Sequence, residues 1–191
     1  MIRKIFVAGF MLCMGLNGYG QYYYKDIFSN NQLLAEMVML KEQKIRTVKV
    51  TGLDDDGRPS DGFTVEKQIN RNYTEVETFT RSAASGPSLF TSRFTKDGLL
   101  VQTVDSSDLA VNTSNYTYDD NNRIKSIRSH IHSSDDDFTN EITETHNYEY
   151  DERGLLQRMY RIKNGRDTSL ILFSPDEKNN VPLQKLLHCG K

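Results

Sequence analysis

The spacing of apolar residues changes along this chain, from a helical period to a strand period. An early segment repeats apolar residues at three- and four-residue spacing, whereas the later segments alternate with period two. The early apolar stripe consists of Leu33, Leu34, Met37, Val38 and Leu40. This spacing predicts one amphipathic helix, with Asn30 and Asn31 as candidate caps. The other side of that helix, with Glu36, Lys41 and Glu42, is expected to face solvent.

Ten later segments have the alternation of strands. They are residues 45–51, 63–70, 73–80, 89–94, 99–105, 114–118, 123–132, 141–150, 155–163 and 168–173. Their connections are short and rich in Gly, Asn and Asp, which tolerate the left-handed backbone of tight hairpins. Strands joined by short hairpins pair antiparallel. The pattern therefore predicts a mainly β protein, an antiparallel meander of hairpins that follows one short helix.

Several strand-turn-strand stretches share one pattern: an aromatic residue, usually Asp, two variable residues, then Gly or Asn. They are residues 94–100, 118–124, 150–156 and, more weakly, 53–59. The aspartate is expected to accept hydrogen bonds from turn amides, and the fifth position to need a positive φ. The structural turn residues predicted in this way, together with one further Asn-Gly turn, are Gly57, Gly98, Asn122, Gly154 and Gly165. Internal repetition indicates architecture and leaves the activity open.

Two of these segments, 118–124 and 150–156, resemble the YD repeat of the rearrangement-hotspot (RHS) family. The family consensus is Tyr-Asp, two variable residues, then Gly-Arg-Leu. Asn122 replaces the glycine, Leu155 replaces the arginine, and Thr95 stands at the aspartate position of a third segment. The resemblance implies repeated hairpins that form secreted or surface shells. The chain is also similar to small exported proteins of Bacteroidota.

Residues 1–20 have the pattern of a cleaved export signal. Arg3 and Lys4 precede an apolar run, and small residues around Gly20 are followed by Gln21, the expected mature start. The run is shorter than the roughly 20 residues that span a bilayer as a helix. A buried N-terminal helix is the alternative. Lipid attachment at Cys13 is not expected, because the large Leu12 precedes it.

Three regions are therefore expected: a signal peptide (1–20), a helical segment (21–44) and a sheet repeat domain (45–191). The protein is expected in the periplasm, at the cell surface or outside the cell, without a stable membrane anchor. Removal of the signal moves the formal charge from −2 to −4. This acidic chain has no basic stripe, so nucleic-acid binding is not expected. Cys189 alone remains, and a single cysteine forms no internal disulfide.

Candidate chemistry is sparse. His130 and His132 form a His-x-His pair in a strand, a pattern that can hold zinc. Strand parity places His146 on the opposite face, with Ile142 and Tyr148, so no metal site and no cofactor are expected. The sequence has no Gly-x-Ser-x-Gly, phosphate-loop or His-Glu-x-x-His motif. No catalytic residue is therefore assigned.

Two functions remain open. The first is an exported, non-catalytic module that binds a protein or glycan of the cell envelope. Its candidate contact residues are Tyr116, Tyr118, Tyr148 and Tyr150, expected on the sheet face that the helix leaves uncovered, although core packing is the alternative for them. The second is a hydrolase of envelope polymers, which needs two carboxylates about 5–10 Å apart in a groove of the sheet.

Overall fold

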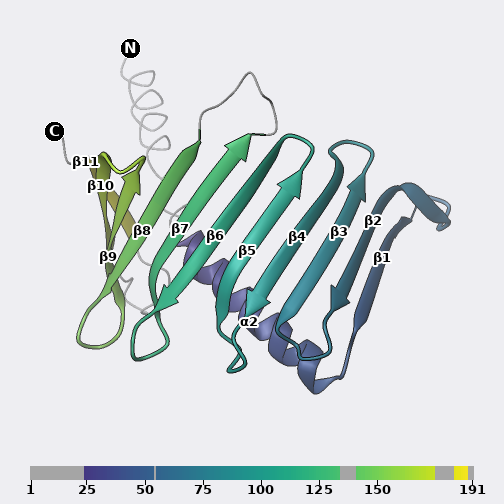
Figure 1. Cartoon of the computed structure of the whole chain (residues 1–191), viewed down its shortest axis with the longest axis horizontal. Coiled ribbons are helices and arrows are strands. Elements are labelled where there is room, and N and C mark those ends of the chain that lie inside the picture. Colours follow the sequence, from purple (N-terminus) through teal and green to yellow (C-terminus); the bar gives the residue numbers. More distant parts are fainter. Residues whose placement is uncertain (1–23, 54, 134–140, 175–182, 189–191) are drawn as a thin grey trace, which may run out of the picture.

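The described part of the chain forms one helix and one eleven-stranded antiparallel sheet (Figure 1). The computed structural model describes residues 24–53, 55–133, 141–174 and 183–188, without the side chains of residues 60, 61 and 183–188. The strands follow one another across the sheet in chain order, so the expected meander is confirmed. The elements are α2 (Lys25–Glu42), β1 (Thr47–Leu53), β2 (Pro59–Ile69), β3 (Glu75–Ser82), β4 (Gly86–Phe94), β5 (Leu100–Ser107), β6 (Ala110–Tyr118), β7 (Ile124–Ser133), β8 (Ile142–Tyr150), β9 (Leu156–Lys163), β10 (Asp167–Ser174) and β11 (Leu183–His188).

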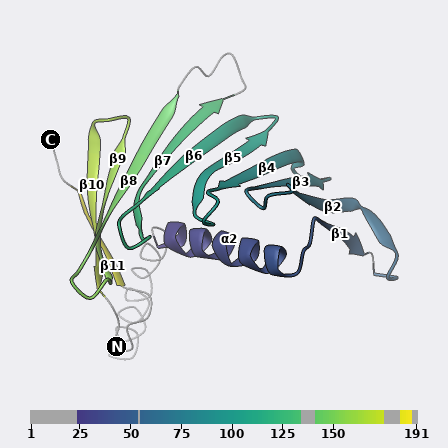
Figure 2. The same ribbon diagram turned by 60° about the horizontal axis from the view of Figure 1, so that its bottom comes forward.

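The sheet is curved, and α2 lies across its concave face (Figure 2). Two core clusters form on this face. One consists of Met37, Leu40, Ile69, Val76, Phe94 and Leu100. The other consists of Ile124, Ile127, Tyr148, Met159, Ile171 and Phe173. Burial of these side chains on one face of the sheet supplies the main stabilisation, about 1.5–3 kcal/mol for each fully buried large side chain.

The helix differs from its prediction in extent and orientation. It begins at residue 25, so Asn30 is no cap: its side chain is buried, and its Oδ1 lies 2.9 Å from the Tyr118 hydroxyl. Val38, predicted in the buried stripe, is 54% exposed. Glu36, predicted to face solvent, forms an ion pair with Lys67 of β2. The concave face therefore uses polar as well as apolar side chains to hold the helix.

The structure contains one strand that the sequence pattern did not predict, β11. Residues 183–188 lack a clear alternation, and pairing with β10 over six positions defines this strand. Pairing to an available sheet edge can thus impose strand structure where local periodicity is weak. β2 and β6 also begin earlier than predicted, at Pro59 and Ala110.

The turns of the β4–β5, β6–β7 and β8–β9 hairpins lie at the same end of the sheet (Figure 1), and they share one hydrogen-bond pattern. In the β6–β7 turn, the Asn122 N–H donates to the Asp119 carbonyl at 3.0 Å. The Arg123 N–H donates to the Asp119 side chain at 2.9 Å. The β8–β9 turn repeats both contacts around Asp151. Thr95 fills the same role in the β4–β5 turn, where its hydroxyl accepts from the Leu99 N–H at 3.0 Å.

A fourth turn of this kind joins β2 and β3 at Asn70, which the sequence analysis did not identify as a repeat. The Asn70 side chain accepts from the Thr74 N–H at 2.9 Å, and Tyr73 has a φ of 55°. Segment 53–59, proposed as the weak copy, joins β1 to β2 at the other end of the sheet. That assignment is corrected: its Gly57 is a turn residue, but its hairpin is not one of this set.

Candidate functional site, a groove between the helix and the sheet

The four candidate tyrosines lie on the face that α2 covers, not on the uncovered one. They are Tyr116, Tyr118, Tyr148 and Tyr150, and all pack in or against the second core cluster. Tyr148 is only 5% exposed, and burial raises its pKa. A tyrosine ring is accommodated in a core when its hydroxyl finds a partner. The expectation of an exposed tyrosine surface is therefore wrong.

Two of these hydroxyls bind the backbone of the preceding hairpin. Tyr118 Oη donates to the Leu100 carbonyl at 2.8 Å, and Tyr150 Oη donates to the Ile124 carbonyl at 2.9 Å. Burial raises the pKa of both Tyr118 and Tyr150 to about 12. These residues hold successive hairpins together.

The predicted turn residues all have a left-handed backbone. The φ values of Gly57, Gly98, Asn122, Gly154 and Gly165 are 77°, 90°, 59°, 81° and 68°. Glycine adopts this conformation without the strain that a β-carbon brings, and asparagine tolerates it. All five therefore have the positive φ that the sequence pattern predicted for them.

A groove of about 410 Å³ lies between the first turns of α2 and the inner strands β6–β9. Alternate residues of these strands line it, because every second side chain of a strand points to the same face. Three isoleucines form its apolar part: Ile127, Ile131 and Ile142. Every other lining residue is polar, charged or tyrosine. The groove is therefore a recess in the concave face whose lining is mixed, with an apolar strip beside polar and charged side chains.

One wall of the groove is a hydrogen-bonded network that we call the groove network: Asp26, His146, Glu144 and Arg161. His146 Nδ1 lies 2.6 Å from Asp26 Oδ2, and Nε2 lies 2.8 Å from Glu144 Oε1. Arg161 donates to Glu144 Oε2 at 2.5 Å, and Tyr148 donates to Asp26 at 2.7 Å. A neutral imidazole carries one N–H, so only the protonated ring donates to both carboxylates.

The pKa shifts in the network agree with this charge state. Burial alone would lower the pKa of His146, but its hydrogen bonds and attraction to Asp26 and Glu144 outweigh burial and raise it. Burial alone would raise the pKa of Glu144, but hydrogen bonds from Arg161 and His146 outweigh burial and lower it. The network therefore holds a cationic ring between two carboxylates.

The rest of the polar lining lies outside the network and, apart from Lys163, is uncharged. Ser114 Oγ and Ser129 Oγ lie 2.8 Å apart across β6 and β7. Asn112 Oδ1 is buried and has no hydrogen-bond partner among the described residues. Lys163, at the β9 side, forms no ion pair within the described part of the chain. Asn112 therefore keeps an unused acceptor, whereas the two serines and the network groups already have partners.

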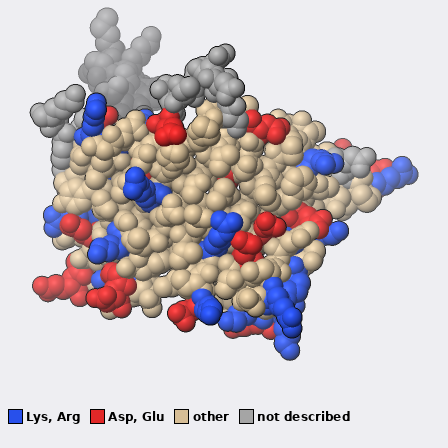
Figure 3. All heavy atoms as spheres, viewed as in Figure 1, with Lys and Arg blue, Asp and Glu red and all other residues tan. Residues whose placement is uncertain are grey.

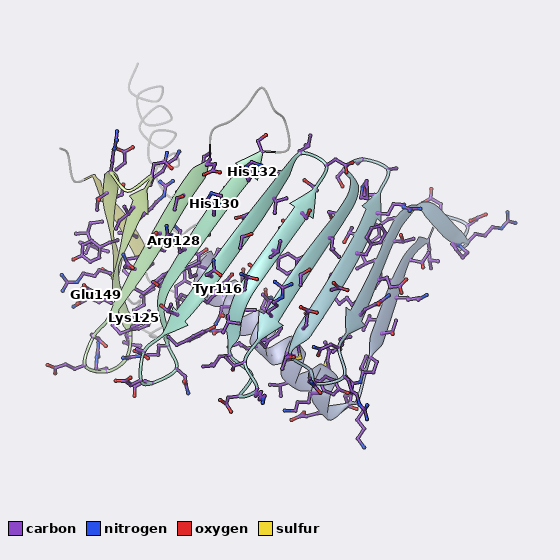
Figure 4. All side chains as sticks on the ribbon, in the orientation of Figure 1. Tyr116, Lys125, Arg128, His130, His132 and Glu149 are labelled. Carbon is purple, nitrogen blue, oxygen red and sulfur yellow. The ribbon has the colours of Figure 1, made fainter. Side chains whose placement is uncertain are left out.

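The other histidines lie on the uncovered face, as strand parity predicted (Figure 4). His130 Nε2 lies 3.3 Å and His132 Nδ1 4.0 Å from the carboxylate of Glu141. His146 faces the helix instead. On the uncovered face, acidic and basic side chains are interspersed with a larger neutral area (Figure 3).

Sequence reasoning missed the groove network, although a signal for it was present. Glu144 and His146 alternate with Tyr148 on β8, so polar residues occupied a face predicted to be core. Asp26, 120 positions from His146, carried no such signal.

Among the described residues, no helix is long and apolar enough to cross a membrane. No protein-family model matches the chain, and neither does any curated protein.

Proposed function

We propose that this protein is an exported, non-catalytic module of the cell envelope whose protein or glycan ligand occupies the groove beside α2. The observation that carries the proposal is the groove itself. Its volume of about 410 Å³ lies within the roughly 300–1,000 Å³ of typical ligand sites. It also brings polar groups from α2 and four strands together. The export pattern of residues 1–20 and the repeat resemblance support an envelope location.

The chemistry of the groove favours binding over catalysis. A general acid or base needs a pKa near the operating pH and a free position at which to exchange a proton. Both ring nitrogens of His146 already contact carboxylates. Glu144 has a lowered pKa, whereas a glycosidase acid needs a raised one.

A hydrolase of envelope polymers is the second candidate, because Asp26 and Glu144 both border the groove and contact His146. Turnover of a cell-wall polymer that Glu144→Gln abolishes would establish it. In the binding module, no polymer is cleaved, and Glu144→Gln changes affinity or stability only.

Two serines of β7 provide a matched test of the binding function. Ser129 lines the groove and contacts Ser114, whereas Ser126 contacts Thr117 on the other face. Each is half-buried and lies 2.8 Å from a hydroxyl of β6. Ser129→Leu fills part of the groove, and Ser126→Leu adds the same side chain outside it.

The measurement is capture of envelope components by the immobilised mature protein. We expect Ser129→Leu to lose a component that both the parent and Ser126→Leu retain, with all three proteins folded by circular dichroism. Equal capture by the two variants would show that the groove is not the binding surface.

A further inference from the structure

The groove offers a ligand no backbone edge to pair with. β6, β7, β8 and β9 are inner strands, each hydrogen-bonded to a neighbour on both sides. An extended peptide binds a sheet by adding a strand at an exposed edge. The edges of the described sheet are β1 and β11, neither of which lines the groove. Recognition in the groove therefore depends on side chains.

The lining combines an apolar strip with hydroxyl and amide groups. Ile131 and Ile142 are cross-strand partners on β7 and β8. Asn112 is the partner of Ile131 on β6. The adjacent row holds Ser114 and Ser129, which are also partners. A sugar ring has the complementary combination, with apolar C–H faces and hydroxyls around its edge.

The charges of the groove largely compensate one another. The groove network pairs two carboxylates with an imidazolium and a guanidinium. Lys163 adds a cation, but its cross-strand partners are the acids Glu144 and Asp167. Asp105, the partner of Asn112 on β5, adds another acid on this face. The groove therefore has no strong field that selects an anion or a cation.

We propose that the groove binds an uncharged saccharide, an inference that rests on the binding function proposed above. The C–H face of one ring lies on Ile131 and Ile142, and its hydroxyls bond to Asn112 and Ser129. Asn112 is the central polar contact, because its Oδ1 has no hydrogen bond among the described residues and a ligand hydroxyl supplies the missing donor.

The test is an array of neutral oligomers of glucose, mannose, galactose and xylose, together with oligomers of glucuronate, mannuronate and galacturonate. Calorimetry follows on the neutral oligomers that bind. We expect binding to a neutral oligomer in preference to its uronate counterpart. Asn112→Ala should weaken it about 5- to 10-fold, the effect of one neutral hydrogen bond. Asn115→Ala is the matched control, because Asn115 lies on the same strand but contacts Gln102 on the other face.

Preference for a uronate oligomer, or unchanged affinity in Asn112→Ala, would overturn the inference. If no saccharide binds but Ser129→Leu still loses a captured envelope component, the saccharide inference fails and the proposed function stands. If no saccharide binds and Ser129→Leu captures the same envelope components as the parent, the saccharide inference and the proposed function are both wrong.

Discussion

Tyr150 holds the last of the four similar hairpins to the one before it: its hydroxyl donates to the Ile124 carbonyl at 2.9 Å. The same relationship recurs one repeat earlier, where Tyr118 donates to the Leu100 carbonyl at 2.8 Å. Each tyrosine precedes a turn, and each carbonyl belongs to the first residue of a strand that leaves the previous turn. The tyrosine of the Tyr-Asp pair therefore ties together neighbouring repeats.

Tyr150→Phe should destabilise the fold by about 0.5–1.5 kcal/mol, because it removes one hydrogen bond and keeps the packing of the ring. Urea denaturation of the mature protein measures the change. Tyr160→Phe is the control, because no hydrogen bond of the Tyr160 side chain is present among the described residues. Equal stability of the two variants would contradict a structural role for the Tyr150 hydroxyl.

Gly98 and Asn122 occupy equivalent turn positions, with φ values of 90° and 59°. Gly98→Val should therefore destabilise the protein by about 1–3 kcal/mol through backbone strain. Beyond the two adjacent residues, a β-carbon at Gly98 would have no heavy atom within 4 Å, so crowding at that atom adds little. Thermal and urea denaturation measure the loss.

Gly98→Asn separates strain from side-chain bulk. Because Asn122 already adopts this conformation, we expect Gly98→Asn to keep more of the stability than Gly98→Val. A valine variant that melts like the parent would mean that the turn does not need a positive φ.

The turns and the meander were predictable because they depend on local chemistry. Gly and Asn permit the left-handed backbone, and alternation identifies a strand with one buried face. The turn at Asn70 was not recognised as a copy of the repeat, because Tyr73 occupies the positive-φ position where Gly or Asn was expected. With it included, Asn70, Thr95, Asp119 and Asp151 are 25, 24 and 32 positions apart.

The candidate site was less predictable because its groups meet only in the folded chain. The alternation of side chains along the strands correctly placed His146 on the face of the sheet opposite to His130 and His132. It did not indicate that α2 would bring Asp26 to that ring. The tyrosines were assigned to the wrong face because an amphipathic side chain can serve a core or a surface equally well. Only their hydroxyl partners, which are remote in sequence, decide between the two.

The signal pattern of residues 1–20 leads to a separate prediction about export. The mature protein should begin at or near Gln21 and be found outside the cytoplasm, because residues 1–20 combine a positive start, an apolar run and small residues at the cleavage site. Cell fractionation followed by N-terminal sequencing tests it. Recovery of the form that begins with Met1 from the cytosol would contradict the prediction.

The groove network should give the fold a stability maximum at mildly acidic pH. The pKa of His146 is raised above 6.5, so its contribution is complete below pH 6.5 and is lost as pH rises through the folded-state pKa. The pKa of Glu144 is lowered below 4.5, so its contribution is present above pH 4.5 and is lost as pH falls through the folded-state pKa. The network therefore stabilises most between pH 4.5 and 6.5.

His146→Gln tests this assignment in urea denaturation from pH 4 to pH 9. At pH 6 the variant should be less stable by about 1–3 kcal/mol, because hydrogen bonds to charged groups are lost. The alkaline fall in stability should also shrink, because the group that loses its proton has been removed. His132→Gln is the control: His132 is exposed on the other face, and its substitution should leave the pH profile unchanged. An alkaline fall that persists in His146→Gln would mean that another group controls it and that the ring is not the cation of the network.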